Sequence, residues 1–124
     1  APCVYYGTEA ALAGGPEPGC REGFPWNRPR CEALQSLIRD MAALRTHQSA
    51  IREGCLIWSS LGRDGLLGQT DSLQVVINRS REQHLPLPDH IRRGIIIWSS
   101  NGLNATPDAL GCQSAVVVTR SESP

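Results

Sequence analysis

The spacing of hydrophobic positions changes near the middle of the chain. From residue 27 to residue 51 apolar residues recur about every 3.6 positions, with charged residues mostly on the opposite side, which predicts one amphipathic helix. Asn27 suits the cap of this helix and Pro29 suits its first turn. The apolar stripe consists of Leu34, Leu37, Ile38, Met41, Leu44 and Ile51.

After Gly54 the pattern changes to short apolar runs separated by glycine and proline. Four such runs are expected to be strands, at residues 55–59, 73–78, 94–99 and 114–119. Short strands with turn residues between them are typical of an antiparallel β-sandwich.

The chain begins with another apolar run, residues 3–6, which favours a strand and stops at Gly7. A polar pair, Thr8 and Glu9, follows, and then a loop rich in glycine and proline that ends at Trp26. A strand that delivers a carboxylate and then a long loop is typical of the rim of an α/β barrel. A single parallel strand has no partner here, so we expect the chain to be the carboxy-terminal piece of a longer protein.

The opening segment resembles the last barrel strand and the following loop of the α-amylase superfamily. The similarity is greatest to the group of neopullulanase, cyclomaltodextrinase and maltogenic amylase. Thr8 and Glu17 stand where many members have aspartate. The matching residues are Pro2, Val4, Tyr5, Tyr6, Gly7, Glu9, Gly15, Pro18, Cys20, Arg21, Phe24 and Trp26.

The resemblance continues downstream. Residues 44–54 are similar to the end of the family's last barrel helix, with Gln48 in place of proline, so the helix is expected to run on past this point. Residues 73–80 and 114–120 are similar to two strands of the family's carboxy-terminal domain. In the family, another strand usually precedes the strand that matches residues 73–80. Here only residues 65–69 could form it, so we expect this strand to be shortened or absent.

The resemblance implies an α+β fragment. Residues 1–51 would be the last strand, loop and helix of a (β/α)8 barrel, residues 52–121 an antiparallel β-sandwich domain, and residues 122–124 a tail. The implied activity of the parent protein is that of a retaining α-glycoside hydrolase acting on starch, maltodextrin, pullulan or cyclodextrin. The family's three catalytic acids lie upstream of Ala1, so the chain alone is expected to be inactive.

The same resemblance implies site residues at the barrel rim, with an α-glucan and the upstream barrel as partners. Glu9 matches a structural glutamate that fixes the rim, and Arg21 is expected to pair with that carboxylate or with another acid. Tyr6 and Trp26 are expected to line the sugar site, although packing is an equally good interpretation of each.

Charge and cysteine content limit other functions. The chain has 12 arginines, no lysine and 12 acidic residues, and this zero net charge argues against nucleic acid as a partner. No apolar run is long enough to span a membrane, and no signal peptide is visible, so we expect a cytoplasmic protein. The alternative is a signal peptide on the part of the protein upstream of Ala1. The five cysteines lack C-x-x-C spacing, which argues against a zinc site and favours free thiols. No cofactor is expected. An oligomer is possible.

Two segments, residues 52–62 and 92–102, look alike and each carries a tryptophan. Trp58 and Trp98 are expected to be core or interface residues, or alternatively a sugar-stacking platform. For the chain as a whole, the alternative function is a non-catalytic carbohydrate-binding or structural module with an amylase-like tail. The cysteine spacing gives no support to a third interpretation, a small redox or metal protein.

Overall fold

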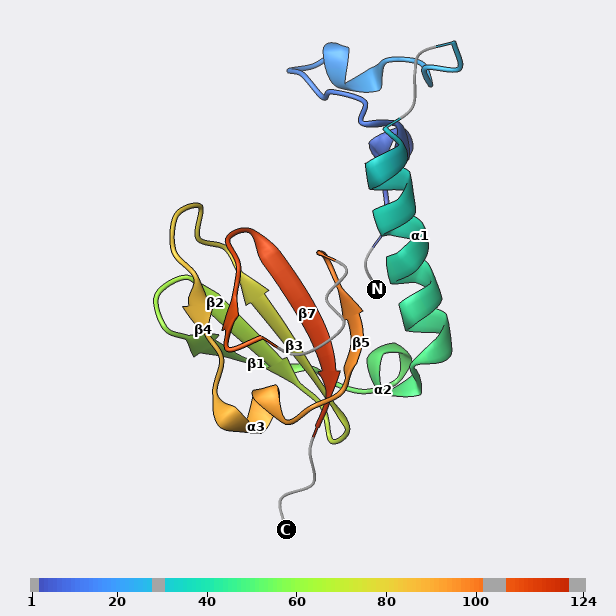
Figure 1. Ribbon diagram of the computed structural model, residues 1–124. Coiled ribbons are helices and arrows are strands. Elements are labelled where there is room, and N and C mark those ends of the chain that lie inside the picture. Colours follow the sequence, from blue (N-terminus) through green and yellow to red (C-terminus); the bar gives the residue numbers. More distant parts are fainter. Residues whose placement is uncertain (1–2, 28–30, 102–106, 121–124) are drawn as a thin grey trace. The chain divides into compact units, whose positions relative to one another are not determined.

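The computed structural model describes residues 3–27, 31–101 and 107–120, and it divides into two compact units, Ala1–Ala43 and Leu44–Pro124 (Figure 1). The proposed position of Pro29 in the first helical turn and the predicted tail at residues 122–124 lie outside the described residues.

The opening segment of the first unit is irregular. Its described residues form two single-turn 3-10 helices, Thr8–Ala10 and Gly19–Arg21, and no strand. The predicted strand at residues 3–6 is therefore not formed, and all four of these residues are exposed. The physical reason is that a parallel strand is stabilised by neighbours that accept and donate its backbone hydrogen bonds, and the described part of this unit offers none.

The predicted long helix is two helices. Helix α1 spans Glu32–His47, and a short helix α2 spans Ser49–Arg52. Between them Gln48 adopts an extended conformation, with φ −108° and ψ 98°, which ends the helical path. The expectation that the helix runs on without proline at this position is wrong, and so is a helical start at residue 27. The expected stripe is partly present, since the half-buried side chains of α1 include Leu34, Ile38, Met41 and Leu44.

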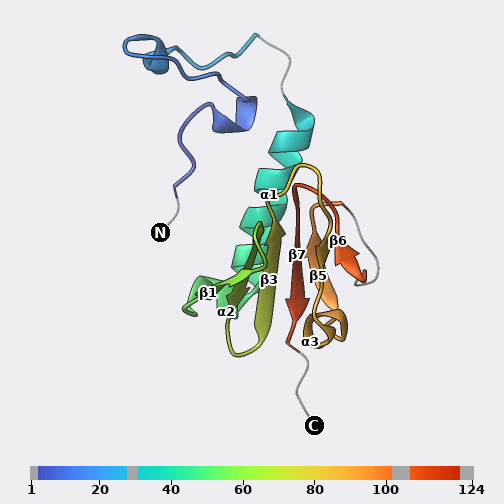
Figure 2. The ribbon, with the colours of Figure 1, turned by 90° about the vertical axis from the view of Figure 1, so that its left-hand side faces the viewer.

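The second unit is built on a five-stranded antiparallel sheet. Its strand order is β1-β2-β3-β7-β5, so the last of these strands in the chain, β7, lies between β3 and β5 (Figure 2). The bounds are β1 Ile57–Leu61, β2 Gly65–Gln69, β3 Leu73–Asn78, β5 Ile96–Ser99 and β7 Ser114–Thr119. A second, two-stranded sheet pairs β4, Leu85–Pro86, with β6, Ala109–Leu110.

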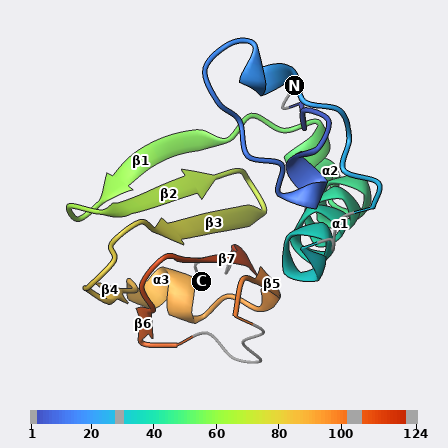
Figure 3. The ribbon, with the colours of Figure 1, turned by 90° about the horizontal axis from the view of Figure 1, so that it is seen from above.

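One face of the large sheet carries the hydrophobic core. The strands β4 and β6 and the short helix α3, Asp89–Arg92, supply the opposing layer, and Figure 3 shows them on the same side of β3 and β7. Burial of these aliphatic side chains is the main stabilising term for the unit. The buried core residues are Leu67, Val76, Leu85, Leu87, Ile91, Leu110, Val116 and Val118.

The predicted antiparallel sandwich is confirmed, including the bounds of β3 and β7, whose runs of β-branched residues favour strands. The predicted loss of the strand at residues 65–69 is wrong. Strand β2 is complete and pairs with both β1 and β3. Its glycines resemble a turn in the sequence, but neighbouring side chains occupy the space above them: a Cβ on Gly65 would lie 2.8 Å from a methyl carbon of Leu85.

Candidate functional site

The four expected rim residues all lie in the first unit, on the irregular segment that ends before α1. Tyr6 is half-exposed, and its hydroxyl donates a hydrogen bond of 3.0 Å to the carbonyl oxygen of Glu22. Partial removal from water, together with the neighbouring Tyr5 and Cys20, raises the pKa of the Tyr6 phenol above its usual value. The hydrogen bond of the Tyr6 hydroxyl connects the two ends of the loop.

Arg21 forms an ion pair with Glu17, four residues earlier, and both side chains are exposed. The expected acidic partner is therefore an acid of the same loop, and the structure does not bring Arg21 to Glu9. Because the pair is open to water, it contributes little to stability. Its effect is local: it connects the turn before Gly19 with the 3-10 helix that follows.

Glu9 lies half-buried in the 3-10 helix Thr8–Ala10, directly after a tight turn at Gly7. Gly7 has a φ of +83°, and its carbonyl oxygen accepts hydrogen bonds from the backbone N–H groups of Ala10 and Leu12. The side chain of Leu12 covers this glycine, so that a Cβ there would lie 2.8 Å from a methyl carbon. The place of Glu9 in space, relative to residues 3–6, is thus set by a backbone turn that only glycine forms easily.

Trp26 is 74% exposed, and its ring contacts that of Phe24 with 4.5 Å between the centroids. An aromatic pair at this distance and tilt is favourable, and it leaves most of the indole open to solvent. The structure therefore brings together Tyr6 with Glu22, Arg21 with Glu17, and Trp26 with Phe24, but it does not gather the four expected residues into one pocket.

No metal site is found in the described part of the chain, where no three His, Cys, Asp or Glu side chains lie close enough to hold an ion. The five cysteines are free thiols, four of them exposed and Cys112 half-buried.

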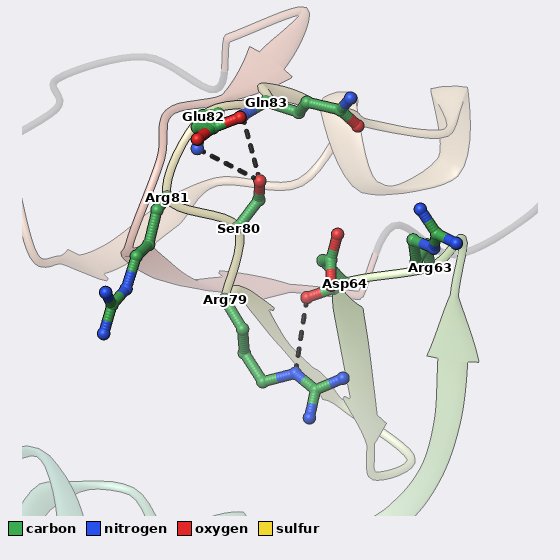
Figure 4. A pocket seen from close by; sticks show the side chains of 7 residues that line it. All are labelled: Arg63, Asp64, Arg79, Ser80, Arg81, Glu82 and Gln83. Carbon is green, nitrogen blue, oxygen red and sulfur yellow. Dashed lines mark hydrogen bonds between the residues drawn. The ribbon is translucent and has the colours of Figure 1, made fainter.

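The second unit has a polar hollow of about 360 Å³ between the turn after β1 and the loop after β3. Figure 4 shows that the guanidinium groups of Arg63, Arg79 and Arg81 point in different directions, so they do not converge on one ligand. Within the hollow, Ser80 Oγ accepts hydrogen bonds from the backbone N–H groups of Glu82 and Gln83. These contacts order the loop and do not form an anion site.

Asn78, at the end of β3, is a structural residue whose role the sequence did not reveal. Its side chain is 1% exposed, and Nδ2 lies 2.9, 3.1 and 2.8 Å from the carbonyl oxygens of Gln83, Leu110 and Gly111. Its Oδ1 accepts a hydrogen bond of 3.0 Å from the N–H of Ser80. One buried amide thus connects β3, the following loop and the end of β6. The only signal in the sequence is an asparagine that ends an apolar strand.

The second face of the large sheet, opposite the core, carries both tryptophans. The register places Trp58, Gly68, Val75, Val117 and Trp98 in one row across the five strands. Trp58 is 49% exposed, so it is not a core residue, whereas Trp98 is half-buried. Both β1 and β5 are edge strands, so the edge position does not explain this difference. Trp58 lies opposite Gly68, which has no side chain, whereas Trp98 lies opposite Val117. The other expectation, that the two tryptophans are interface residues, stays a prediction.

No family model matches the chain. A cyclomaltodextrinase of Geobacillus thermopakistaniensis (strain MAS1) is 30% identical over 95 residues, which make up 70% of this chain and 16% of that protein. An intracellular maltogenic amylase of Bacillus subtilis (strain 168) is 36% identical over 62 residues, 48% of this chain and 10% of that protein.

A solved structure also matches. The chain is similar to the ligand-free cyclic alpha-maltosyl-(1→6)-maltose hydrolase from Arthrobacter globiformis, with a TM-score of 0.72 and 28% identity, over 98% of this chain and 27% of that one. The chain thus spans at most 16% of the length of the two curated relatives. The names of the sequence relatives and of the solved structure agree with the family that the sequence resembles, and the solved structure agrees with the sandwich fold. In sequence and in fold, the chain is a carboxy-terminal region of the α-amylase family.

Proposed function

We propose that the chain is part of a longer retaining α-glycoside hydrolase that cleaves starch, maltodextrin, pullulan or cyclodextrin, and that it is inactive alone. The observation that carries the proposal is the similarity to a cyclomaltodextrinase over 70% of this chain but only 16% of that enzyme. Residues 1–51 would complete the catalytic barrel, and residues 52–121 would form the accessory sandwich.

The chemistry of such an enzyme explains why this part is insufficient. A retaining glycosidase uses one carboxylate as nucleophile and a second as acid and base, about 5–5.5 Å apart. In the family pattern these acids precede the segment that matches residues 2–26, so the rest of the polypeptide supplies them. The contribution of this chain is to position the rim: Tyr6 and Arg21 order the loop, and Trp26 presents an exposed ring.

The proposed location is the cytoplasm, and this rests on the name of one relative, an intracellular maltogenic amylase. The structure adds one observation: among its described residues, no helix combines the length and the apolar character needed to cross a bilayer.

We expect the purified chain to release no reducing sugar from starch, pullulan or cyclodextrin, because it lacks the nucleophile and the acid/base. The parent protein, expressed from the coding sequence that includes the region upstream of Ala1, should hydrolyse at least one of them. Reducing-sugar assays on both proteins, with a mock purification as control, provide the measurement. Turnover by the clean chain would contradict the proposal, and a parent protein that binds glucan without cleaving it would favour the non-catalytic module.

Within the parent, Arg21→Ala should lower turnover by about tenfold without changing the melting temperature. The exposed pair with Glu17 contributes little to stability, but its loss frees a loop at the rim, where small displacements slow the chemical step by about tenfold or more. Trp26→Ala should act similarly, since its ring is 74% exposed. The matched control is Arg81→Ala, another exposed arginine on a loop of the second unit. Unchanged turnover for Arg21→Ala would show that the loop is only structural.

A further inference from the structure

The ring of Trp58 lies flat over the backbone of its neighbouring strand. A Cβ built on Gly68 would lie 2.9 Å from two carbon atoms of the six-membered ring of Trp58 and 3.1 Å from a third. Three ring atoms at nearly the same distance mean that one face of the indole covers the glycine. The other face is free of this contact, in agreement with the 49% exposure of the residue.

The positions directly beside this ring in the sheet are uncharged. In the register, the positions on this face of β1, β2 and β3 next to Trp58 and Gly68 are Ser60, Leu66, Val75 and Ile77. A basic patch, which a phosphate-rich ligand would require, is therefore absent from these described positions. A neutral ligand with an apolar face and polar edges fits such a surface better than an ionic one.

Polar groups are nevertheless available beside the ring. Ser60 is exposed, and it lies on the same face of β1 two residues from Trp58, about 7 Å along the strand. Strand β1 is also an edge strand, so every second residue directs its backbone N–H and C=O away from β2. An aromatic platform bordered by a hydroxyl and free backbone groups offers both stacking and hydrogen bonds.

We propose that the outer face of Trp58, held flat by Gly68 and bordered by Ser60, is a binding site for a neutral α-1,4-linked glucan. A glucose ring presents axial C–H bonds on its faces and hydroxyls around its edge. It therefore matches an electron-rich aromatic face with polar groups at its border. The choice of an α-linked glucan rests on the proposed function, whereas the site itself rests on the geometry of the second unit.

The proposed site uses none of the expected rim residues. It lies on β1 and β2 of the second unit, while Tyr6, Glu9, Arg21 and Trp26 belong to the first. Its role would be to hold polymeric substrate, so its loss should weaken binding to long glucans and leave cleavage of short ones unchanged.

The test uses the 124-residue chain with maltoheptaose as the probe in isothermal titration calorimetry. We expect saturable binding that weakens by about tenfold in Trp58→Ala, because a stacked aromatic contact supplies much of the affinity of a small exposed site. Gly68→Ala should weaken binding comparably while keeping the indole, since the added methyl displaces the ring from the sheet. The matched control is Ile57→Ala, its exposed neighbour on β1 whose side chain points to the other side of the sheet.

Four outcomes overturn the inference. Binding that is absent, or that persists in Trp58→Ala at unchanged melting temperature, removes Trp58 as the platform. Equal affinity for cellohexaose, a β-linked glucan, shows that the site does not select α-linkages. A dimer in sedimentation analysis that dissociates in Trp58→Ala shows that this surface contacts a second copy instead. The proposed function is tested separately by turnover of the parent protein, so the failure of one proposal does not imply the failure of the other.

Discussion

Replacing Asn78 by alanine should lower the free energy of unfolding of the chain by about 2–4 kcal/mol, or the melting temperature by about 10–20 °C. The side chain is buried, and its amide group is within hydrogen-bond distance of three carbonyl oxygens and of the N–H of Ser80. Alanine removes these partners and leaves buried polar groups of the β6 end without a donor, which costs more than the loss of an average hydrogen bond.

The same strand offers a matched control for Asn78. Gln74 is also 1% exposed and lies on the same face of β3, but its Oε1 has no hydrogen-bond partner among the described residues. Gln74→Leu removes that unsatisfied atom at similar volume, so its stability should stay within about 1 kcal/mol of the original chain, or rise. Thermal and urea unfolding followed by circular dichroism compare the two variants. Equal losses would show that burial of the side chain, rather than the hydrogen bonds of Asn78, determines the stability.

Gly65→Ala should cost about 2–3 kcal/mol, the upper part of the usual range for overpacking. Gly65 is buried opposite Leu61, and a Cβ on it would overlap the backbone oxygen of Leu61 and lie 2.8 and 2.9 Å from the two methyl carbons of Leu85. A flexible side chain can move aside, but a paired backbone oxygen moves only if β1 and β2 separate. The substitution should therefore loosen the first hairpin of the sheet.

Gly23→Ala is the control for Gly65, because nothing lies within 4 Å of a Cβ at Gly23. Its effect should stay within about 0.5 kcal/mol. Hydrogen exchange of the amides in β1 and β2 separates a local effect from a global one: in Gly65→Ala these amides should lose protection first. If both glycine variants unfold at the same temperature, the close approach at Gly65 is not a constraint on the sheet.

The strands that the sequence predicts well are those whose own residues decide their conformation. The bounds of β3 and β7 follow from uninterrupted runs of β-branched residues, which favour extended backbone in any context. Strand β2 could not be predicted because its glycines form a strand only where Leu85 and Trp58 occupy the space above them. That packing depends on side chains outside the strand itself, which the local pattern of β2 does not reveal.

For the expected site, too, the sequence predicted the motif but not the contacts of its side chains. The motif with Tyr6, Glu9, Arg21 and Trp26 agrees with the family to which the chain belongs, yet their roles in binding remain a prediction. The spacing of the motif did not show that Arg21 pairs with Glu17. Glu17 lies four residues before Arg21, and it competes with any acid farther away in the chain for the guanidinium group. Nor did the sequence distinguish the exposed Trp58 from the half-buried Trp98, since the two segments are alike and both lie on edge strands. The difference is the residue opposite each ring, Gly68 for Trp58 and Val117 for Trp98.

The position of β7 has a consequence for the synthesis of the protein. This strand is central in the sheet although it is the last of the described strands to be translated, and within the described residues β5 pairs with no other strand. While the ribosome is still adding residues before Ser114, the β1–β2–β3 segment can form by local pairing, but β5 has no strand to pair with and the core lacks Val116 and Val118. A nonsense codon shortly before Ser114 would thus release a polypeptide with an exposed β3 edge, a species prone to aggregation and proteolysis.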